Sequence, residues 1–365
     1  MKEIKVKKGL TTVAPYEKNL TTVTQDKIIN YYKQKDGIFI CISGATFNAT
    51  GGSQRPQQLA EGFVEDFGVI HTAHTNGYSL QNFNGHKIMT ANIKGIVNFL
   101  QNTEGVSKKV FYTAFPEKNS TAFVSGLGDD WFVIYDCVDE WEDFKSATWY
   151  KPENEQKIAK RADLVICTAK ILQDKFKWHK NCNYLPNSTK VDVTGKDWSR
   201  KQPIDLVFVG FLNEEWIDFG LFRLLSKKFS IRIIGEPPND MRYFEHKNVE
   251  WTGKKHSSEI VKLLSEAKVG IIPFKNQPLV HAVNPIKLWD YCAAGIPTVG
   301  AYMPEIETLP YGGFNVNSSQ QFFKICQYLV QNYEQIDRKR LLDIAKENTY
   351  IQRVEQLRKW MSELS

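Results

Sequence analysis

Residues 268–301 read KVGIIPFKNQPLVHAVNPIKLWDYCAAGIPTVGA. The stretch begins and ends with short apolar runs, KVGIIPF and IPTVGA. Runs of this kind are typical of strands that are buried on both faces of a parallel sheet. Between them, Pro285 suits the first turn of a helix and Gly295 its C-terminal end. The pattern predicts a helix from Asn284 to Ala294 with Asn284 as the N-cap, and thus a strand–helix–strand unit.

The same alternation extends along the rest of the chain. The other predicted strands are GIFICIS (37–43), GVIHTAH (68–74), KKVFYTAF (108–115), DWFVIYDCV (130–138), ADLVICTA (162–169), IDLVFVG (204–210), SIRIIG (230–235) and NVEWTG (248–253). Helical patterns lie between many of them and fill the tail from Ser318 to Ser365. Strands that alternate with helices predict α/β domains with parallel sheets.

A polar stretch without apolar periodicity, residues 187–203, separates two such alternations and is typical of a linker. We therefore expect two Rossmann-like, doubly wound domains at 1–190 and 203–345. The segment 346–365 is expected to be a helix that crosses back to the first domain. Ligands of such folds bind at the carboxyl ends of the strands, so a central cleft between the domains is the expected site.

Composition is that of a soluble globular protein, with 365 residues, 42% hydrophobic and 24% charged side chains and a net charge of +6. The six cysteines are scattered and show no metal-binding spacing, so they are interpreted as reduced. The N-terminus lacks the apolar core of a signal peptide and no apolar run is long enough to span a membrane. A cytoplasmic protein is expected.

Lysines are concentrated in residues 151–180. This stretch is either a solvated helix face or a patch that meets anionic lipid headgroups or a phosphorylated acceptor. No recognisable nucleic-acid-binding motif accompanies the charge, so nucleic acid is not an expected partner.

The predicted helix after KVGIIPF offers an anion site. The backbone N–H groups of Ile286 and Lys287 lack intrahelical acceptors there, and the helix dipole favours a phosphate. The Lys287 side chain adds a positive charge, and Asp290 follows one turn later. The alternative is an ordinary capped helix with a surface ion pair.

The run NPIKLWDYCAAGIPTVG (284–300) resembles the signature P-x-K-[LF]-x-E-Y-x-A-x-G-x-P-V-V of family 4 glycosyltransferases, which have the two-domain GT-B fold. QRPQQLA (54–60), YDCVDEWEDF (135–144) and ADLVICTAKIL (162–172) are similar to further elements of these enzymes. Similar strings occur in enzymes of the teichuronic-acid or capsular-polysaccharide type. The resemblance implies a role in bacterial cell-envelope glycan assembly.

The resemblance also implies roles in donor binding. By position, Asp290 matches the second acid of the family's E-x7-E motif, which binds the ribose of the nucleotide. Pro285, Ile286 and Lys287 form the phosphate side, and Gly210 corresponds to the glycine of the loop that opens the second domain. Residues Thr252 and Gly253 match the region that faces the base, although a threonine and a glycine after a strand are also typical of a plain turn.

Two departures from the family pattern concern the donor. The first acid of the motif falls at Ala282, which leaves Asn284 and His281 as nearby polar candidates for a catalytic role. FLNEEWID (211–218) stands where relatives often carry an Arg and a Lys that clamp the diphosphate.

On the acceptor side, the resemblance places the loop GATFNATGGS (44–53) under the donor sugar, with Gly51 and Gly52 allowing close backbone approach and Arg55 able to meet an anionic group. The alternative is a flexible surface loop. Asp136 and Asp139 follow a strand on the cleft side. Asp139 is the first candidate for a general base or for the group that orients the acceptor hydroxyl, and a solvated acidic helix start is the alternative.

The sequence therefore predicts a metal-independent, retaining glycosyltransferase that uses a nucleotide-sugar donor, with UDP-sugar favoured, and a glycan or lipid-linked acceptor. No cofactor and no metal ion is expected, because no convincing D-x-D motif is present. A catalytically weak homologue that binds another transferase is the main alternative. An NAD-dependent oxidoreductase is disfavoured because no G-x-G-x-x-G follows either first strand, and an epimerase is less compatible with residues 284–299.

Overall fold

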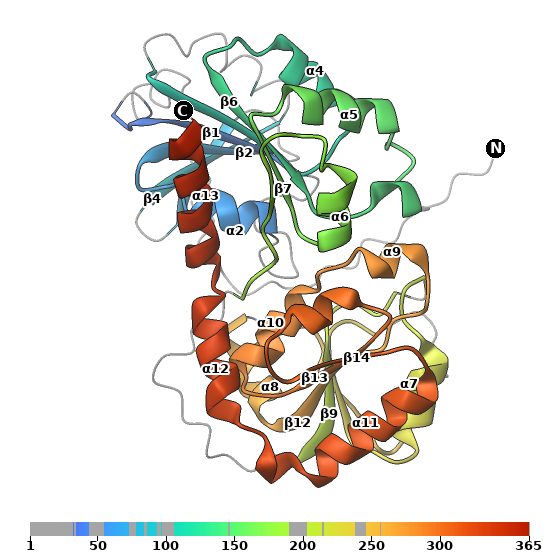
Figure 1. Cartoon of the computed structure of the whole chain (residues 1–365). Helices are drawn as coiled ribbons and strands as arrows, with labels where there is room; N and C mark the ends of the chain where they lie inside the picture. The colour runs from blue at the N-terminus through green and yellow to red at the C-terminus, as the bar shows by residue number, and fades with distance from the viewer. Residues whose placement is uncertain are drawn as a thin grey trace, which may run out of the picture.

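The computed structural model of the chain describes residues 32, 34–43, 55–72, 78–83, 86–92, 96, 106–144, 147–189, 203–213, 215–237, 246–255 and 257–364. These residues form two α/β domains, one above the other in Figure 1. Gly51 and Gly52 lie outside the described residues.

The N-terminal domain contains an eight-stranded sheet in the order β3-β4-β2-β1-β5-β6-β7-β8. Its neighbouring strands are parallel, except that β3 runs antiparallel to β4. The strands are β1 (Gly37–Ile42), β2 (Phe67–Thr72), β3 (Tyr78–Phe83), β4 (His86–Ala91), β5 (Lys108–Thr113), β6 (Trp131–Cys137), β7 (Leu164–Cys167) and β8 (Cys182–Tyr184). The described helices of this domain are α2 (Arg55–Glu61), α4 (Lys118–Gly126), η1 (Trp141–Asp143), α5 (Pro152–Arg161) and α6 (Lys170–Lys175).

The C-terminal domain contains a six-stranded parallel sheet in the order β11-β10-β9-β12-β13-β14. The strands are β9 (Ile204–Val209), β10 (Ile231–Ile234), β11 (Val249–Trp251), β12 (Ala267–Ile272), β13 (Thr298–Ala301) and β14 (Gly313–Val316). The helices are α7 (Phe219–Ser226), α8 (Ser257–Ser265), α9 (Pro278–His281), α10 (Ile286–Ala293), η2 (Pro304–Thr308), α11 (Ser319–Gln331), η3 (Tyr333–Gln335), α12 (Arg338–Glu347) and α13 (Tyr350–Leu364). The predicted βαβ unit is β12–α10–β13, with the short helix α9 inserted before α10.

Each sheet has one topological switch point, where strands that follow one another in the sequence are added first on one side and then on the other. In the first sheet β1 lies between β2 and β5, and in the second β9 lies between β10 and β12. Because ligands of doubly wound sheets bind at the carboxyl ends of the strands beside this point, the ends of β1 and β9 mark the functional edge of each domain. In Figure 1, α9 and α10 lie at the edge of the lower domain that faces the upper one.

The last helix ties the end of the chain to the first domain. Figure 1 shows α13 rising from the lower domain to lie beside α2. Val354 and Leu357 are buried in the apolar cluster on that face of the N-terminal sheet. Gly62 permits the approach, because a Cβ there would lie 2.3 Å from Val354 Cγ2. Arg358 donates a hydrogen bond to the Gly62 carbonyl at 2.8 Å and pairs with Asp66.

We predict that Leu357→Ala lowers the free energy of unfolding by about 2–4 kcal/mol, because it removes a fully buried side chain and leaves a cavity. Ile351→Ala on the same helix is the matched control, since Ile351 is 52% exposed. Urea titration of both variants measures the difference. Equal stability of the two variants would show that α13 is not docked on the N-terminal domain.

Candidate functional site

The end of β9 is built for close approach by a ligand. Gly210 has φ of +130°, a conformation that L side chains rarely adopt. A Cβ at Gly210 would lie 3.7 Å from Lys287 Nζ, and a Cβ at Gly235 would lie 2.1 Å from the Gly210 carbonyl oxygen. The missing side chains leave the backbone of this turn open toward Lys287.

The N-terminus of α10, which carries Lys287, lies beside Gly210. Pro285 is the N-cap residue and Ile286 the first helical residue, so the prediction that Asn284 caps the helix is wrong. No side chain caps this terminus. The first N–H groups of a helix have no intrahelical acceptor, so those of Ile286 and Lys287 can donate to an anion.

The Lys287 ammonium is a largely buried cation without an ion-pair partner among the residues that the structure describes. It lies over the rings of Phe208 and Phe274, 5.5 Å and 5.2 Å from the centroids. Burial lowers the pKa of Lys287 to about 8, and the charge of Asp290 opposes this shift. A cation held in this way gains most from an anionic ligand.

Asp290 lies one helical turn beyond Lys287. Its Oδ1 accepts a hydrogen bond from the Thr189 hydroxyl at 3.0 Å. Burial raises the pKa of Asp290 to about 6, although the Thr189 bond and Lys287 lower it. Asp290 is therefore ionised at neutral pH and can accept from ligand hydroxyls.

Thr252 and Gly253 follow β11 at the same edge of the sheet. The Thr252 hydroxyl contacts the Ile233 carbonyl at 3.3 Å, so it folds back onto the backbone. Gly253 has φ of +68°, and no atom of the described residues lies within 4 Å of where its Cβ would be. The open space at Gly253 suits a ligand face better than the Thr252 side chain does.

Ala282 occupies the position where the family pattern has its first acid. Its methyl group is 2% exposed and belongs to an apolar cluster that otherwise consists of N-terminal-domain side chains. His281 is partly exposed and its Nε2 contacts Asn276 Oδ1 at 3.0 Å. Position 282 is therefore a packing contact between the domains.

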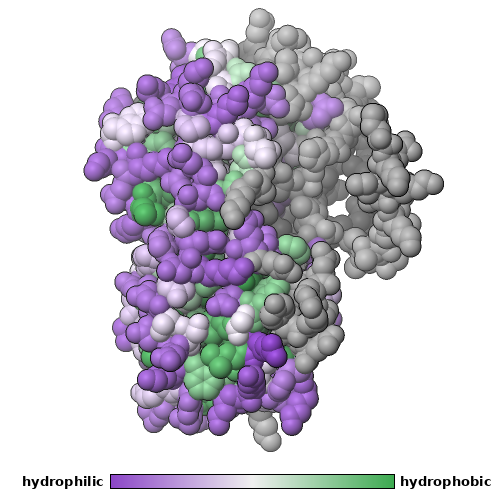
Figure 2. Space-filling model, turned by 90° about the vertical axis from the view of Figure 1, so that its right-hand side faces the viewer, coloured by the Kyte–Doolittle hydropathy of each residue, from purple (hydrophilic) through white to green (hydrophobic). Residues whose placement is uncertain are grey.

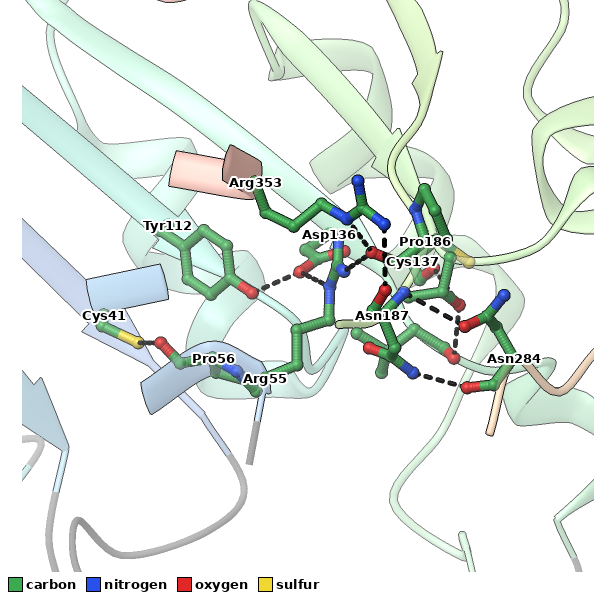
Figure 3. Close-up of polar contacts among 12 residues, drawn as sticks. Cys41, Arg55, Pro56, Tyr112, Asp136, Cys137, Pro186, Asn187, Asn284 and Arg353 are labelled. Carbon is green, nitrogen blue, oxygen red and sulfur yellow. Dashed lines mark hydrogen bonds and ion pairs between the residues drawn. The ribbon is translucent and has the colours of Figure 1, made fainter. Parts of the chain in front are cut away.

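Asn284, which the sequence offers as a catalytic candidate, is held by several hydrogen bonds in the structure. Its Oδ1 accepts from the Asn187 backbone N–H at 3.1 Å and from Trp289 Nε1 at 3.2 Å. Its Nδ2 donates to Glu305 at 2.8 Å, and its carbonyl accepts from Asn187 Nδ2 at 2.5 Å (Figure 3). These hydrogen bonds and an exposure of 3% indicate that Asn284 helps to hold the two domains in contact.

Glu305 is a buried acid that sequence reasoning missed. It accepts hydrogen bonds from the Lys170 backbone N–H and the Tyr184 hydroxyl of the N-terminal domain, both at 2.7 Å. Together with Asn284, it joins the two domains. The sequence MPEIETLP gives no signal for this role, because a glutamate in a Pro-flanked turn is usually exposed.

Arg55 and Asp136 form a buried ion pair, with Arg55 Nε 2.7 Å from Asp136 Oδ2. Tyr112 also donates to Asp136, and Arg55 Nη1 donates to the Pro186 carbonyl at 3.0 Å. Figure 3 shows this cluster directed at the Pro186–Asn187 segment. Both residues thus hold the N-terminal domain together. Arg55 Nη2 has no hydrogen-bond partner among the described residues, so a contact of Arg55 with an anionic group stays a prediction.

Asp139 follows β6 and differs from its acidic neighbours. Glu140 pairs with Lys175 at 2.5 Å, whereas the Asp139 carboxylate makes no hydrogen bond within the described ranges. Burial, with the charges of Asp136 and Glu140, raises the pKa of Asp139 to about 7. A half-buried carboxylate with such a pKa suits proton transfer near neutral pH.

A continuous set of rings runs from the segment that follows β6 to the lysine site; we call it the aromatic row. Its members are Phe115, Trp141, Phe144, Trp149, Trp216 and Phe274. The contact between domains is that of Phe144 and Trp216, whose centroids are 5.2 Å apart. The structure thereby brings the segment after β6 and the Lys287 site to the two sides of one interdomain contact.

Within the described part of the chain, no group of three or more His, Cys, Asp or Glu side chains is placed to hold a metal ion. All six cysteines are free. No described helix is long and apolar enough to cross a membrane.

Comparison with known proteins identifies the fold. No family model matches the chain. It is 24% identical over 212 residues to the "Putative teichuronic acid biosynthesis glycosyltransferase TuaH" of Bacillus subtilis (strain 168), a match that covers 49% of this chain and 53% of the relative. The chain thus matches about half the length of this curated relative.

Two solved structures cover nearly the whole chain. Sucrose-phosphate synthase of Thermosynechococcus elongatus superimposes with a TM-score of 0.67 at 12% identity, over 90% of this chain and 99% of that one. HepE of Anabaena in complex with UDP gives 0.66 at 11% identity, over 90% and 100%. These similarities confirm the GT-B fold and the resemblance to glycosyltransferases.

We predict that Lys287→Met stabilises the protein at pH 7 by about 1–2 kcal/mol, because the native state then no longer buries a charge. The native pKa of about 8 lies below the ordinary 10.5, so the unfolded chain binds the extra proton between these values. The stability of the wild type therefore rises with pH across this window, and the advantage of the variant disappears. Urea titration at pH 7 and pH 10.5, with exposed Lys228→Met as the control, measures this. A less stable Lys287→Met at pH 7 would contradict it.

Proposed function

We propose that the chain is a glycosyltransferase that binds a nucleoside-diphosphate sugar at the Gly210–Lys287 site, with a UDP-sugar favoured. The single observation that carries this proposal is the partly buried Lys287 ammonium, which has no ion-pair partner among the described residues. It lies at an uncapped helix N-terminus, beside a glycine with positive φ at the sheet's switch point. Helix N–H groups and a cation at one point match a diphosphate. The Anabaena relative of the same fold has been solved with UDP and with UDP-glucose, which supports this donor class.

In the proposed mechanism, Ile286 N–H, Lys287 N–H and the Lys287 ammonium hold the diphosphate, and Asp290 accepts from the ribose hydroxyls. The bond between the anomeric carbon and the diphosphate oxygen breaks, and the departing oxygen takes the electron pair. The Lys287 charge stabilises the negative charge that develops there, without a metal ion.

The acceptor hydroxyl oxygen forms the new bond to the anomeric carbon. We propose that Asp139 orients this hydroxyl and receives its proton, which its pKa of about 7 permits. Retention of anomeric configuration is proposed from the resemblance to family 4 enzymes. The proposed acceptor is a glycan or lipid-linked saccharide of cell-envelope polysaccharide synthesis, as the teichuronic-acid name of the relative suggests.

The alternative, a catalytically weak GT-B homologue that binds another transferase, rests on two observations. Ala282 is buried where relatives have an acid, and Phe211, 67% exposed, follows Gly210 where relatives often have a basic residue. Binding of a donor without any turnover would favour this alternative.

The donor proposal predicts that UDP raises the melting temperature of the protein. UDP, GDP, dTDP, CMP and NAD are compared in the same screen, with EDTA present. A ligand at a hundred times its dissociation constant adds about 2.7 kcal/mol of stability. Lys287→Met and Asp290→Asn should lose the shift, and Lys228→Met should keep it. A shift with NAD alone, or none with any nucleotide, would overturn the donor site.

The role of Asp139 predicts that Asp139→Asn lowers kcat about 10²–10⁴-fold while UDP binding is retained. Because the ionised form is the active one, wild-type kcat/KM should rise with pH through about 7 and then level off. The variant should lack this limb, and exposed Asp143→Asn should keep it. Unchanged kcat in Asp139→Asn would exclude the role.

We also propose a contact with an anionic membrane surface at the cytoplasmic face. Residues 151–180 contain exposed lysines on α5 and α6 and two exposed apolar side chains, Ile171 at 52% and Trp178 at 49%. In Figure 2, the coloured part of the upper domain is mainly hydrophilic with small apolar patches. Lysines attract anionic headgroups and tryptophan suits the interface.

This contact predicts that the protein sediments with phosphatidylglycerol vesicles and much less with phosphatidylcholine vesicles at low salt. Trp178→Ala should weaken binding several-fold. Tyr328→Ala is the control, because Tyr328 is 57% exposed on α11 of the other domain. Equal binding to both lipids would argue against it.

A further inference from the structure

The two segments that link the domains lie side by side at Thr189; we call them the crossing. The first segment follows β8 and the second joins α12 to α13, and Thr189 forms a parallel bridge with Thr349. The Thr189 N–H donates to the Asn348 carbonyl at 3.2 Å, and the Thr189 carbonyl accepts from the Tyr350 N–H at 3.3 Å. The second segment therefore fixes the backbone position of Thr189.

The side chain of Thr189 reaches the proposed donor site. Its hydroxyl donates to Asp290 Oδ1 on α10 at 3.0 Å. Thr189 is fully buried, whereas Asp290 is only partly buried. Within the part of the chain that the structure describes, Asp290 Oδ2 makes no hydrogen bond. One carboxylate oxygen is thus held by the crossing, and the other is left for a ligand.

The ionisation of Asp290 depends on the same hydrogen bond. Burial raises the pKa of Asp290 to about 6, and the Thr189 bond and the Lys287 charge both oppose this rise. In the described ranges, the titratable groups that interact with Asp290 are Lys287 and Tyr291, both on α10. A hydroxyl that donates to a carboxylate stabilises its ionised form. Loss of the Thr189 hydroxyl would therefore raise the pKa of Asp290 further.

The crossing does not need this bond in order to hold α10. Asn187 already binds Asn284, just before the helix, through two hydrogen bonds. The Arg353 guanidinium lies 5.6 Å from the centre of the Trp289 ring on the helix itself. An amide or a hydroxyl at position 290 would accept from Thr189 without the desolvation cost of a carboxylate. An acid at this position therefore indicates a use for its charge and its second oxygen.

We propose that Thr189 is a positioning residue of the donor site: it holds one oxygen of the Asp290 carboxylate so that the other meets the ribose hydroxyls of the nucleotide. This proposal rests on the proposed function, in which Asp290 accepts from the ribose. Because the crossing fixes Thr189, the carboxylate is oriented before the nucleotide binds, which lowers the cost of ordering it. The same bond connects the nucleotide site with the segments that link the domains.

The first test needs no ligand. The ¹³C signals of the aspartate side-chain carboxyl groups are titrated with pH, and Asp290→Asn assigns the signal of Asp290. Thr189→Val should raise the pKa of Asp290 above its value of about 6, and Thr189→Ser, which keeps the hydroxyl, should not. Thr349→Val is the matched control, because the buried Thr349 hydroxyl has no hydrogen-bond partner among the described residues. An unchanged pKa in Thr189→Val would overturn the proposal.

The second test compares the binding of UDP, 2′-deoxy-UDP and 3′-deoxy-UDP by calorimetry. The wild type should bind at least one deoxy nucleotide about tenfold to hundredfold more weakly than UDP, as expected for a hydrogen bond to a charged group. Thr189→Val should bind UDP more weakly and lose most of this preference, whereas Thr189→Ser and Thr349→Val should keep it. A purely structural role of Thr189 would weaken the binding of all three nucleotides by the same factor, and that result would contradict the proposal.

The outcomes separate this proposal from the proposed function. If the wild type binds UDP and both deoxy nucleotides equally, the role of Thr189 is overturned and the diphosphate site stands. If the wild type does not bind UDP, the proposed function is overturned and the role of Thr189 with it, whatever the pKa of Asp290. Should Thr189→Val not fold, Thr189→Ala and Thr189→Cys, whose thiol is a weak donor, give the same comparison.

Discussion

The Pro186–Asn187 segment, at the end of the first domain, is the constraint on which the arrangement of the site depends. The Pro186 carbonyl accepts from Arg55 Nη1 and from Arg353 Nε, each at 3.0 Å, so the start of α2 and the start of α13 share one acceptor. Asn187 is bound on its other side by Asn284. Buried polar groups are costly when unpaired, so this segment holds one geometry in which the two domains meet. Figure 3 shows these groups converging from both domains.

This constraint explains which polar side chains remain for chemistry. Arg55 and Asp136 pair with each other inside the N-terminal domain, and Asn284 and Glu305 join the two domains. Lys287 and Asp139 are left without ion-pair partners among the described side chains, and burial shifts the pKa of each toward neutrality. Buried charged groups without a partner reduce the stability of a protein, and they are typical of sites where a ligand supplies the partner.

The sequence predicted most of the fold because parallel strands that are buried on both faces are continuous apolar runs. The predicted strands from 37–43 to 248–253 correspond to β1, β2, β5, β6, β7, β9, β10 and β11. It missed β3 and β4, which carry polar residues (YSLQNF and HKIMTA), and the short edge strands β8 and β14. Edge and antiparallel strands lack the continuous apolar signal.

The site was predictable only in part. The predicted helix N-terminus and the family pattern indicated Lys287, Asp290 and Gly210 as candidates, because a helix N-terminus that can bind a phosphate is recognisable from the local sequence. They could not predict the contacts of Asn284 and Arg55, because their partners, Asn187 and Asp136, lie 97 and 81 residues away. Glu305 and the aromatic row escaped notice for the same reason: only the folded chain brings their members together.

The most direct measurement of the central claim is calorimetry of UDP binding at pH 8.5 in two buffers with different ionisation enthalpies. Unbound Lys287, with a pKa of about 8, is mostly neutral at this pH, and a diphosphate beside it restores the charge. The account predicts uptake of more than about half a proton per UDP bound, and none in Lys287→Met. Tight binding of UDP to the wild type without proton uptake would show that Lys287 does not hold the diphosphate and would contradict the account.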